Sequence, residues 1–230
     1  MMIPMQILPS SFKNTENFRQ ALDAVPFLRL YGNTLLMIAG RVLCAVIFSS
    51  MAGYGFARMQ FPFKNLFFGI VLLQMMVPGQ IFIVPQYMML SKINMLNTVF
   101  ALVFPALVSA FGTFLLRQQY MSLPKELEEA AILDGCNPWQ TFIKIMVPIT
   151  KSTIASLAIF TALFAWKDLM WPLIANNDLN HMPLSAGLSV LQGVCHTNKG
   201  AMMAGSVIAT VPMLVIYILC QKQFIEGIAQ

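Results

Sequence analysis

The chain has 230 residues, of which 58% are hydrophobic and only 10% are charged, and its mean hydropathy is +0.71. A soluble domain of this length cannot bury so many apolar side chains, so the composition indicates an all-α, polytopic membrane protein. The net charge of +5 does not indicate a nucleic-acid-binding protein, because the basic residues are dispersed and no aromatic residues alternate with them on a polar surface.

Five apolar runs are long enough to cross a membrane, since about 20 helical residues span roughly 30 Å of hydrocarbon. They cover residues 34–56, 66–88, 98–116, 153–173 and 201–219. Prolines interrupt several of them, and bent or broken helices are one way to accommodate this. The segment 1–32 is broken by polar residues and has no signal-peptide pattern. The sequence therefore predicts five transmembrane helices, with the two termini on opposite sides.

The distribution of Lys and Arg predicts the orientation, because short cytoplasmic loops accumulate basic residues. The loops on one side of the predicted spans contain Arg58, Lys64, Arg117, Lys125, Lys144, Lys151 and Lys222. The opposite loops contain only Lys92 and Lys199, apart from three basic residues in the segment 1–32. We therefore expect residues 118–150 and the tail 223–230 in the cytoplasm, and residues 1–32 outside.

The first half of the polar stretch 122–148 has the signals of a short helix. Ser122 can cap a first turn, Pro124 suits a first turn because it has no N–H to lose, and acidic residues follow near the positive end of the dipole. Gly135 favours the left-handed conformation that ends a helix. We predict a helix that begins near Leu123 and ends at Gly135.

A second amphipathic helix is predicted directly after this glycine. Asn137 is a good N-cap residue and Pro138 a good first residue. Apolar residues then recur at helical spacing, at Trp139, Phe142, Ile143 and Met146. We expect Pro148 to close this helix, so that residues 122–148 form a helical hairpin.

This hairpin resembles the EAA loop of the permease subunits of bacterial ABC importers. The family pattern is EAA, three residues, G, nine residues and I-x-L-P, and the sequence has Glu129-Ala130-Ala131, Gly135 and Ile145-Met146-Val147-Pro148 at this spacing. Only Val147 departs from it. The resemblance implies a cytoplasmic coupling helix that docks into a groove on a separate ATPase subunit. It assigns this coupling to Glu128, Glu129, Ala130, Ala131, Asp134, Gly135, Ile145 and Pro148. The alternative from the residues alone is an amphipathic hairpin lying on the membrane surface.

Four further pieces resemble the carbohydrate-importing branch of this family. They are Asn33-Thr34-Leu35, the run from Gly53 to Arg58 with Phe61, Trp166 with Pro172, and Phe224-Ile225-Glu226-Gly227. The resemblance implies the six-helix fold of type I importers, with residues 33–222 as the transmembrane domain. We expect the first of the six helices to be missing here, through a truncated start or divergence. The branch imports sugars and glycerol phosphate esters.

The resemblance also implies the assembly. A second permease subunit would complete a heterodimer in the bacterial plasma membrane, in contact with membrane lipid. Two ATP-binding subunits would dock from the cytoplasm, and an extracellular solute-binding protein would deliver the sugar. The chain has no G-x-x-x-x-G-K-[ST] motif, so we expect it to bind no cofactor itself and its partners to use the ATP. An ion-coupled secondary transporter, a non-transporting remnant and a membrane enzyme are the alternatives, although no enzyme motif was found.

Charged residues within the predicted spans are the candidates for the solute pathway. Each charge costs about 2.5–3.5 kcal/mol near a bilayer centre, so Arg41, Lys167 and Asp168 should not face lipid at mid-depth. Lys167 can also extend to the membrane surface beside interfacial Trp166 and Trp171. The candidate pathway residues are Arg41, Trp166, Lys167, Asp168 and Trp171.

Small residues and cysteines have structural interpretations. Ser49, Gly53 and Ala57 recur every four residues, a spacing that allows two helices to approach closely. The four cysteines contain no CxxC pair, so neither a disulfide nor a zinc site is predicted. Cys195-His196 is the nearest approach to a metal pair, but it lacks enough neighbouring ligands.

Overall fold

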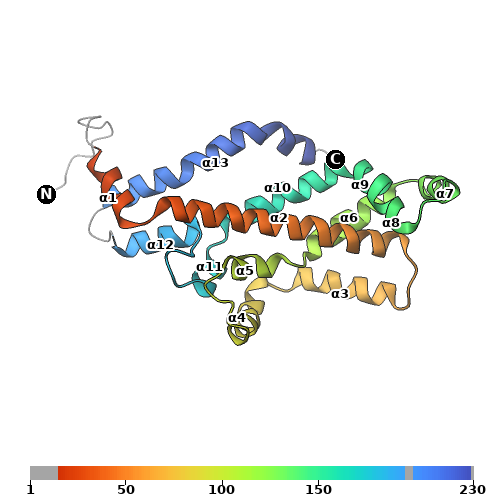
Figure 1. The fold of residues 1–230 in the computed structure, drawn as a ribbon, viewed down its shortest axis with the longest axis horizontal. Helices are drawn as coiled ribbons and strands as arrows, with labels where there is room; N and C mark the ends of the chain where they lie inside the picture. The colour runs from red at the N-terminus through yellow and green to blue at the C-terminus, as the bar shows by residue number, and fades with distance from the viewer. Residues whose placement is uncertain (1–14, 195–198, 229–230) are drawn as a thin grey trace.

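The computed structural model describes residues 15–194 and 199–228, and within these ranges it is helical without any strand. The long helix α2 runs along the molecule, with α10 and α13 on one side and α3, α4 and α5 on the other (Figure 1). The shorter elements lie around this frame. The elements in chain order are α1 (Glu16–Ala24), α2 (Phe27–Arg58), α3 (Lys64–Met76), η1 (Gly79–Phe82), α4 (Ile83–Lys92), α5 (Val99–Val103), η2 (Phe104–Ala106), α6 (Ala110–Ser122), α7 (Glu126–Leu133), α8 (Pro138–Thr141), the π-helical turn η3 (Phe142–Met146), α9 (Val147–Ile149), α10 (Lys151–Lys167), α11 (Met170–Ala175), α12 (Leu184–Val194) and α13 (Lys199–Ile228).

Helix α2 is the structural axis. Its 32 residues extend for about 48 Å at 1.5 Å per residue, more than the thickness of a bilayer core. One face is buried along its whole length, at intervals of three or four residues. The buried residues include Leu30, Thr34, Met37, Arg41, Ala45, Ser49 and Gly53. The predicted first span, 34–56, lies entirely within this helix.

Small residues allow α2 and α6 to pack closely, as the sequence predicted. A methyl group on Gly53 would lie 2.9 Å from the backbone nitrogen of Arg117. A methyl group on Gly112 would lie 2.5 Å from Oγ of Ser49. Both distances are shorter than van der Waals contact, so the two helices meet where neither has a bulky side chain.

Three of the remaining helix pairs are bent at short breaks. The angle between α3 and the segment Gly79–Lys92 is 102°. The angle between Val99–Ala106 and α6 is 47°, and the angle between Pro138–Ile149 and α10 is 76°. In the described part of the chain, one helix is long and apolar enough to cross a membrane, or up to four if each bent pair is one span. The count of five spans therefore stays a prediction.

Breaks divide three predicted spans. The run 98–116 is bent by 47° between Val99–Ala106 and α6. The run 66–88 is divided at Val77 and Pro78, where a proline removes an N–H from the helical ladder. The run 153–173 ends as a helix at Lys167, and α11 then begins in a new direction after the extended residue Asp168. The predicted fifth span lies within α13.

Several predicted segments extend beyond the described residues. Residues 1–14 of the N-terminal segment, Cys195, His196 and the last two residues of the tail are among the undescribed parts. Of the remaining N-terminal segment, α1 packs against α12 and α13, and residues 27–32 already belong to α2. Cys44 and Cys136 are free thiols.

We predict that Gly53→Ala destabilises the fold, because the added methyl group must separate α2 from the α6 backbone. Overpacking of this kind costs about 1–3 kcal/mol, and each kcal/mol lowers the melting temperature of a domain of this size by roughly 2–4 °C. Thermal unfolding of the purified protein in detergent measures the effect. Gly69→Ala is the matched control, since no other atom lies within 4 Å of that position. Equal melting temperatures for the two variants would contradict the close-packing account.

Candidate functional site

The hairpin that follows α6 starts later than the sequence indicated. Ser122 is the last residue of α6, and its Oγ donates a hydrogen bond to the carbonyl of Gln119 at 2.8 Å. Leu123 is extended, as expected for a residue that precedes a proline. Helix α7 therefore begins at Glu126, and the predicted start near Leu123 with Ser122 as its cap was wrong.

The turn between the two helices of the hairpin is built as predicted. Gly135 has a φ of +79°, a conformation that glycine adopts without a steric penalty. Its N–H donates to the carbonyl of Ile132 at 3.0 Å, and the N–H of Cys136 donates to that of Ala131 at 2.9 Å. This pair of bonds is the Schellman arrangement, which satisfies the last carbonyls of α7.

The second helix starts with a complete capping box. The side chain of Asn137 accepts from the N–H of Gln140 at 2.8 Å, and the side chain of Gln140 accepts from the N–H of Asn137 at 2.9 Å. Pro138 occupies the first position, as predicted. The helix continues through η3 and α9 to Ile149, one residue beyond the predicted end at Pro148.

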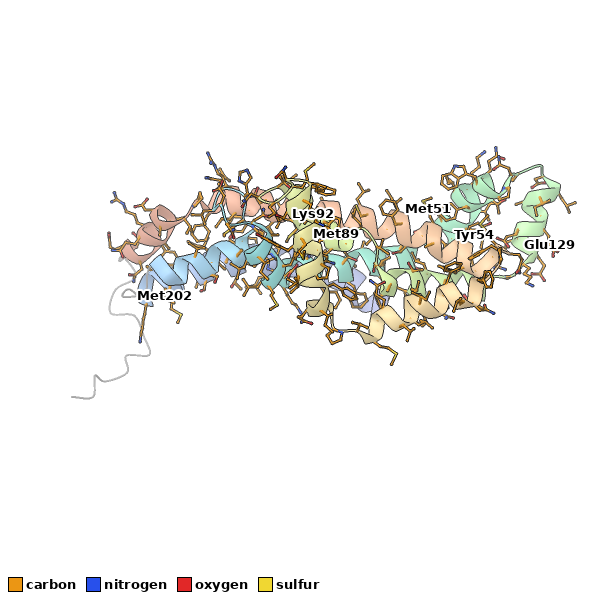
Figure 2. The ribbon with its side chains drawn as sticks, turned by 90° about the horizontal axis from the view of Figure 1, so that it is seen from below. Met51, Tyr54, Met89, Lys92, Glu129 and Met202 are labelled. Atoms are coloured by element: carbon orange, nitrogen blue, oxygen red, sulfur yellow. The ribbon has the colours of Figure 1, made fainter. Side chains whose placement is uncertain are left out.

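The tip of the hairpin presents both acidic and apolar side chains to the outside. Glu129, Ala130, Asp134, Gly135 and Pro148 are exposed, Glu128 and Ile145 are half-buried, and Ala131 is buried. Four large apolar side chains of the hairpin are also exposed, namely Ile132, Leu133, Trp139 and Ile143. Leu133 is the most open of them, with 87% of its surface exposed. Figure 2 places Glu129 at one end of the elongated molecule and Met202 at the other.

A buried contact fixes the base of the hairpin to α2. Nε of Arg58 lies 3.6 Å from a carboxylate oxygen of Glu128, and the two side chains are only 8% and 18% exposed. Nη2 of Arg58 donates to the carbonyl of Leu123 at 2.6 Å. The ring of Tyr54 packs against Phe142, with 5.1 Å between ring centroids. This role of Arg58 and Tyr54 could not be predicted from the sequence, because no local pattern pairs them with the hairpin.

Arg41 and Asp168, two candidates for the solute pathway, form an ion pair. Nη1 of Arg41 lies 2.8 Å from Oδ2 of Asp168, and the side chains are 8% and 22% exposed. Nε of Arg41 also donates to the carbonyl of Leu102 at 2.7 Å. The pair joins α2 to α5 and to the break between α10 and α11. A charge that would be costly alone in the membrane is thus neutralised within the protein.

The five candidate pathway residues separate into two groups. Asp168 and Trp171 line a pocket of about 340 Å³ at the α3–α4 break, and the indole N–H of Trp171 donates to the carbonyl of Ala101 at 2.8 Å. Trp166 and Lys167 line a different pocket, of about 370 Å³, beside α12 and α13. Arg41 belongs with the first group through its ion pair.

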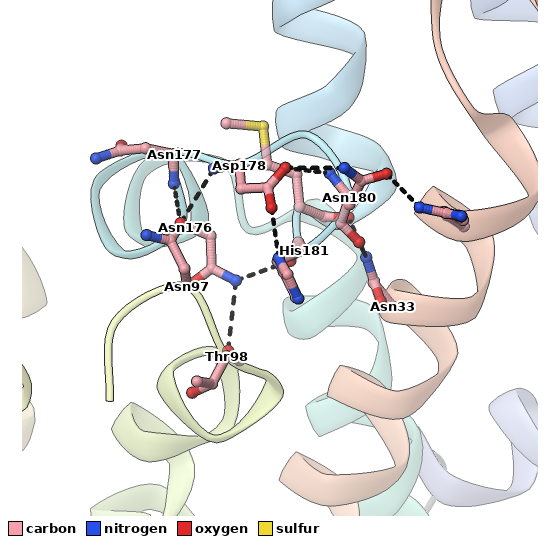
Figure 3. A network of polar contacts seen from close by, with 10 residues as sticks. Asn33, Asn97, Thr98, Asn176, Asn177, Asp178, Asn180 and His181 are labelled. Atoms are coloured by element: carbon pink, nitrogen blue, oxygen red, sulfur yellow. Dashed lines mark hydrogen bonds and ion pairs between the residues drawn. The ribbon is translucent and has the colours of Figure 1, made fainter. Parts of the chain in front are cut away.

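A polar network lies in the loop between α11 and α12 (Figure 3). Asn176 is completely buried, and its Nδ2 donates to the carbonyls of His181 at 2.7 Å and Thr98 at 3.3 Å. Oδ1 of Asn97 accepts from the N–H of Asn177 at 2.6 Å and of Asp178 at 3.0 Å. The loop is therefore held against the segment that precedes α5.

The same loop is bound to α2. Nδ2 of Asn33 donates to the carbonyls of Asn180 and Met182 at 2.8 and 2.9 Å. The Asp178 carboxylate accepts from the N–H of Asn180, and its other oxygen lies 2.8 Å from Nδ1 of His181. These hydrogen bonds lower the pKa of Asp178 below its usual value. Within the described residues, no group of three or more His, Cys, Asp or Glu side chains could hold a metal ion.

Comparison with known proteins identifies relatives across most of the chain. The family described as "Binding-protein-dependent transport system inner membrane component" matches residues 45–228. The chain is 36% identical to the arabinooligosaccharides transport system permease protein AraQ of Halalkalibacterium halodurans, over 86% of this chain and 71% of the relative. It is 29% identical to the sn-glycerol-3-phosphate transport system permease protein UgpE of Shigella flexneri, over 98% of this chain and 83% of the relative.

A solved structure shares the fold. It belongs to a bacterial ABC transporter involved in the import of the acidic polysaccharide alginate. The superposition has a TM-score of 0.77 and covers 92% of this chain and 80% of the other, at 21% sequence identity.

We predict that removing one partner of the Arg41–Asp168 pair destabilises the protein more than removing both. Arg41→Met leaves a largely buried carboxylate without its cation, which costs about 3 kcal/mol or more. The double variant Arg41→Met/Asp168→Leu should recover most of this loss. Thermal unfolding in detergent gives the double-mutant cycle.

The exposed pair Arg19–Asp23, whose side chains are 79% and 75% exposed, provides the matched control. The corresponding Arg19→Met and Asp23→Leu variants should change stability little, because exposed ion pairs contribute little. Additive losses at Arg41 and Asp168 would contradict the paired arrangement.

Proposed function

Because the chain belongs to the family of binding-protein-dependent transport system inner membrane components, we propose that it carries a sugar or sugar-like solute across the bacterial plasma membrane as one permease subunit of an ATP-driven importer. The relatives that support a sugar-like solute are the permeases for arabinooligosaccharides and for sn-glycerol 3-phosphate. The chain is a transport subunit and not an enzyme, and ATP hydrolysis belongs to a separate subunit.

This proposal rests mainly on the exposure of the hairpin. Its tip combines the carboxylates of Glu129 and Asp134 with the exposed apolar side chains of Ile132 and Leu133. An anionic inner membrane surface attracts basic segments, so an acidic tip is poorly suited to rest on lipid headgroups. Exposed apolar side chains surrounded by charge are instead typical of a protein-docking surface. We assign this surface to an ATP-binding subunit.

Motion of the hairpin would reach the membrane through its buried base. Glu128 contacts Arg58, and Phe142 contacts Tyr54, so both helices of the hairpin are attached to α2. Helix α2 in turn carries Arg41, which lies about 26 Å from Arg58 along the helix axis. A rigid helix attached at both points can transmit closure of the ATPase subunits to the polar pocket beside Asp168.

The remaining parts of the importer follow from this assignment. A second permease subunit would complete a heterodimer, a second ATP-binding subunit would dock on it, and an extracellular solute-binding protein would deliver the solute. The loop 118–150, which contains the hairpin, and the tail 223–230 would face the cytoplasm, and the segment 1–32 would face the exterior. The transmembrane domain would cover residues 33–222, and the pathway would pass the Arg41–Asp168 pair, with Lys167 and Trp166 on a separate face.

We expect Glu129→Lys and Gly135→Pro to abolish capture of the ATP-binding subunit and solute uptake, while the chain still inserts into the membrane. The first variant reverses the charge at the exposed tip. The second removes the N–H that bonds to Ile132 and requires a negative φ where the chain has +79°. Co-purification from membranes and uptake in cells that contain the partner subunits measure the two effects.

The control for these variants is Asp23→Lys, which reverses an exposed carboxylate in α1. It should leave capture of the ATP-binding subunit unchanged. Normal uptake in either hairpin variant would remove the hairpin from the coupling mechanism.

Glu128→Leu should separate docking from coupling. The side chain of Glu128 faces Arg58 and not the exposed tip, so the ATP-binding subunit should still co-purify. Uptake should fall because the hairpin loses its charged contact with α2. Glu128→Gln, which retains an acceptor for Arg58, should keep more uptake than Glu128→Leu. Loss of ATPase capture as complete as in Glu129→Lys would show that Glu128 contacts the partner directly.

A further inference from the structure

The break between α3 and α4 interrupts a predicted span at membrane depth. The two parts meet at 102°, and Pro78 at the break is extended, with ψ of 127°. Backbone that leaves the helical hydrogen-bond ladder is tolerated in the hydrocarbon region only where it is buried in protein or lines a water-filled cavity. The break is exposed on its outer side, since Val77, Pro78, Gly79 and Gln80 are all exposed in this chain. It therefore requires either water or another polar partner.

Three glutamines surround this break and face one pocket. Gln74 lies in the last turn of α3, Gln80 in η1 and Gln86 in α4, and all three line the pocket of about 340 Å³. None of their side chains has a hydrogen-bond partner among the described residues. Gln74 lies about 15 Å from Lys64 along α3, half of the roughly 30 Å core. Unpaired amides at this depth are costly, so they indicate contact with solvent or solute.

The charge of the pocket selects the class of solute. Asp168 is its one charged lining residue, and Arg41 already neutralises it from behind. Nη2 of Arg41 has no hydrogen-bond partner within the described part of the chain, but this atom is buried and the residue is only 7% exposed, so an anion in the pocket cannot reach it. A phosphate or carboxylate group would therefore enter without a cation to pair with, next to a carboxylate.

The other residues that line the pocket can bind the hydroxyl groups of a solute. A glutamine amide both donates and accepts hydrogen bonds, as a hydroxyl group does. The N–H of Trp171 is already occupied by Ala101, so its ring provides an apolar wall for the C–H groups of a solute. The volume of about 340 Å³ lies at the lower end of the range for small-molecule sites, which fits a short saccharide and not a long chain.

We propose that Gln74, Gln80 and Gln86 form a hydrogen-bonding subsite for an uncharged polyhydroxylated solute, next to the Arg41–Asp168 pair. This inference rests on the proposed importer function and identifies the solute class for that pathway.

Thiol labelling tests the subsite without depending on transport. Each glutamine is replaced by Cys in a chain whose four native cysteines are Ala, and the complex with its partner subunits is placed in lipid nanodiscs. A membrane-impermeant methanethiosulfonate should label the three thiols at least about tenfold faster than Leu73→Cys, because only a hydrated thiol ionises to the reactive thiolate. Leu73 is the matched control, as it is adjacent in α3, 61% exposed and outside the pocket lining.

Protection by solutes then tests the chemical class. Arabinotriose at ten times its dissociation constant should slow labelling at the three positions about tenfold, whereas sn-glycerol 3-phosphate at the same concentration should not. Labelling as slow as at Leu73→Cys, or protection by the phosphate ester alone, would overturn the subsite. If the three thiols are labelled, and arabinotriose protects them, in a complex that shows no ATP-dependent uptake, the importer function would be contradicted. The subsite would still be supported.

Uptake kinetics give a second readout. Gln80→Leu should raise the KM for arabinotriose about fivefold, the loss of roughly one hydrogen bond. Gln60→Leu, an exposed glutamine in the connection between α2 and α3, should not change KM. An unchanged KM in Gln74→Leu, Gln80→Leu and Gln86→Leu, in a complex that imports arabinotriose, would refute the subsite while the importer function stands.

Discussion

The buried ion pair between Arg41 and Asp168 is the interaction on which the membrane part of the structure depends. It joins the middle of α2 to the point where α10 ends, and a further bond from Arg41 to Leu102 adds α5. Without it, two charges would lie at membrane depth among elements that are short and bent. With it, the adjacent pocket is lined by polar groups but carries no free cation. The same pair thus joins three elements and, on the proposed pathway, would set the charge that a solute encounters.

A second attachment, at the other end of α2, links this pocket to the hairpin. Arg58 and Tyr54 fix the base of the hairpin by one charged and one aromatic contact. Between the two attachments, α2 packs closely against α6. Gly53 lies against the backbone of Arg117, and Gly112 lies against the side chain of Ser49, so neither position has room for a larger side chain. Displacement of the hairpin would therefore move α2 as a unit, which is how this short hairpin could act on the distant pocket.

Local signals in the sequence were sufficient for the hairpin but not for the membrane helices. The roles of Gly135, Asn137 and Pro138 depend on neighbours a few residues away, and the structure confirms all three. Ser122 is not a cap because Pro124 favours an extended conformation at Leu123, so that α7 cannot begin there. The pairing of Arg41 with Asp168, or of Arg58 with Glu128, joins residues far apart in the chain, and no periodicity reveals such contacts. Hydropathy likewise indicated the apolar runs, and the prolines indicated that some helices bend, but neither predicted the angle of 102° at Pro78.

We propose above all that the hairpin lies on the cytoplasmic side of the membrane, where an ATP-binding subunit binds it. Labelling of Leu133→Cys with a membrane-impermeant thiol reagent, in a chain without native cysteines, tests it most directly. We predict labelling in inside-out vesicles but not in right-side-out vesicles, and protection when the ATP-binding subunits are bound. Labelling from the exterior, or equal labelling with and without these subunits, would contradict the account.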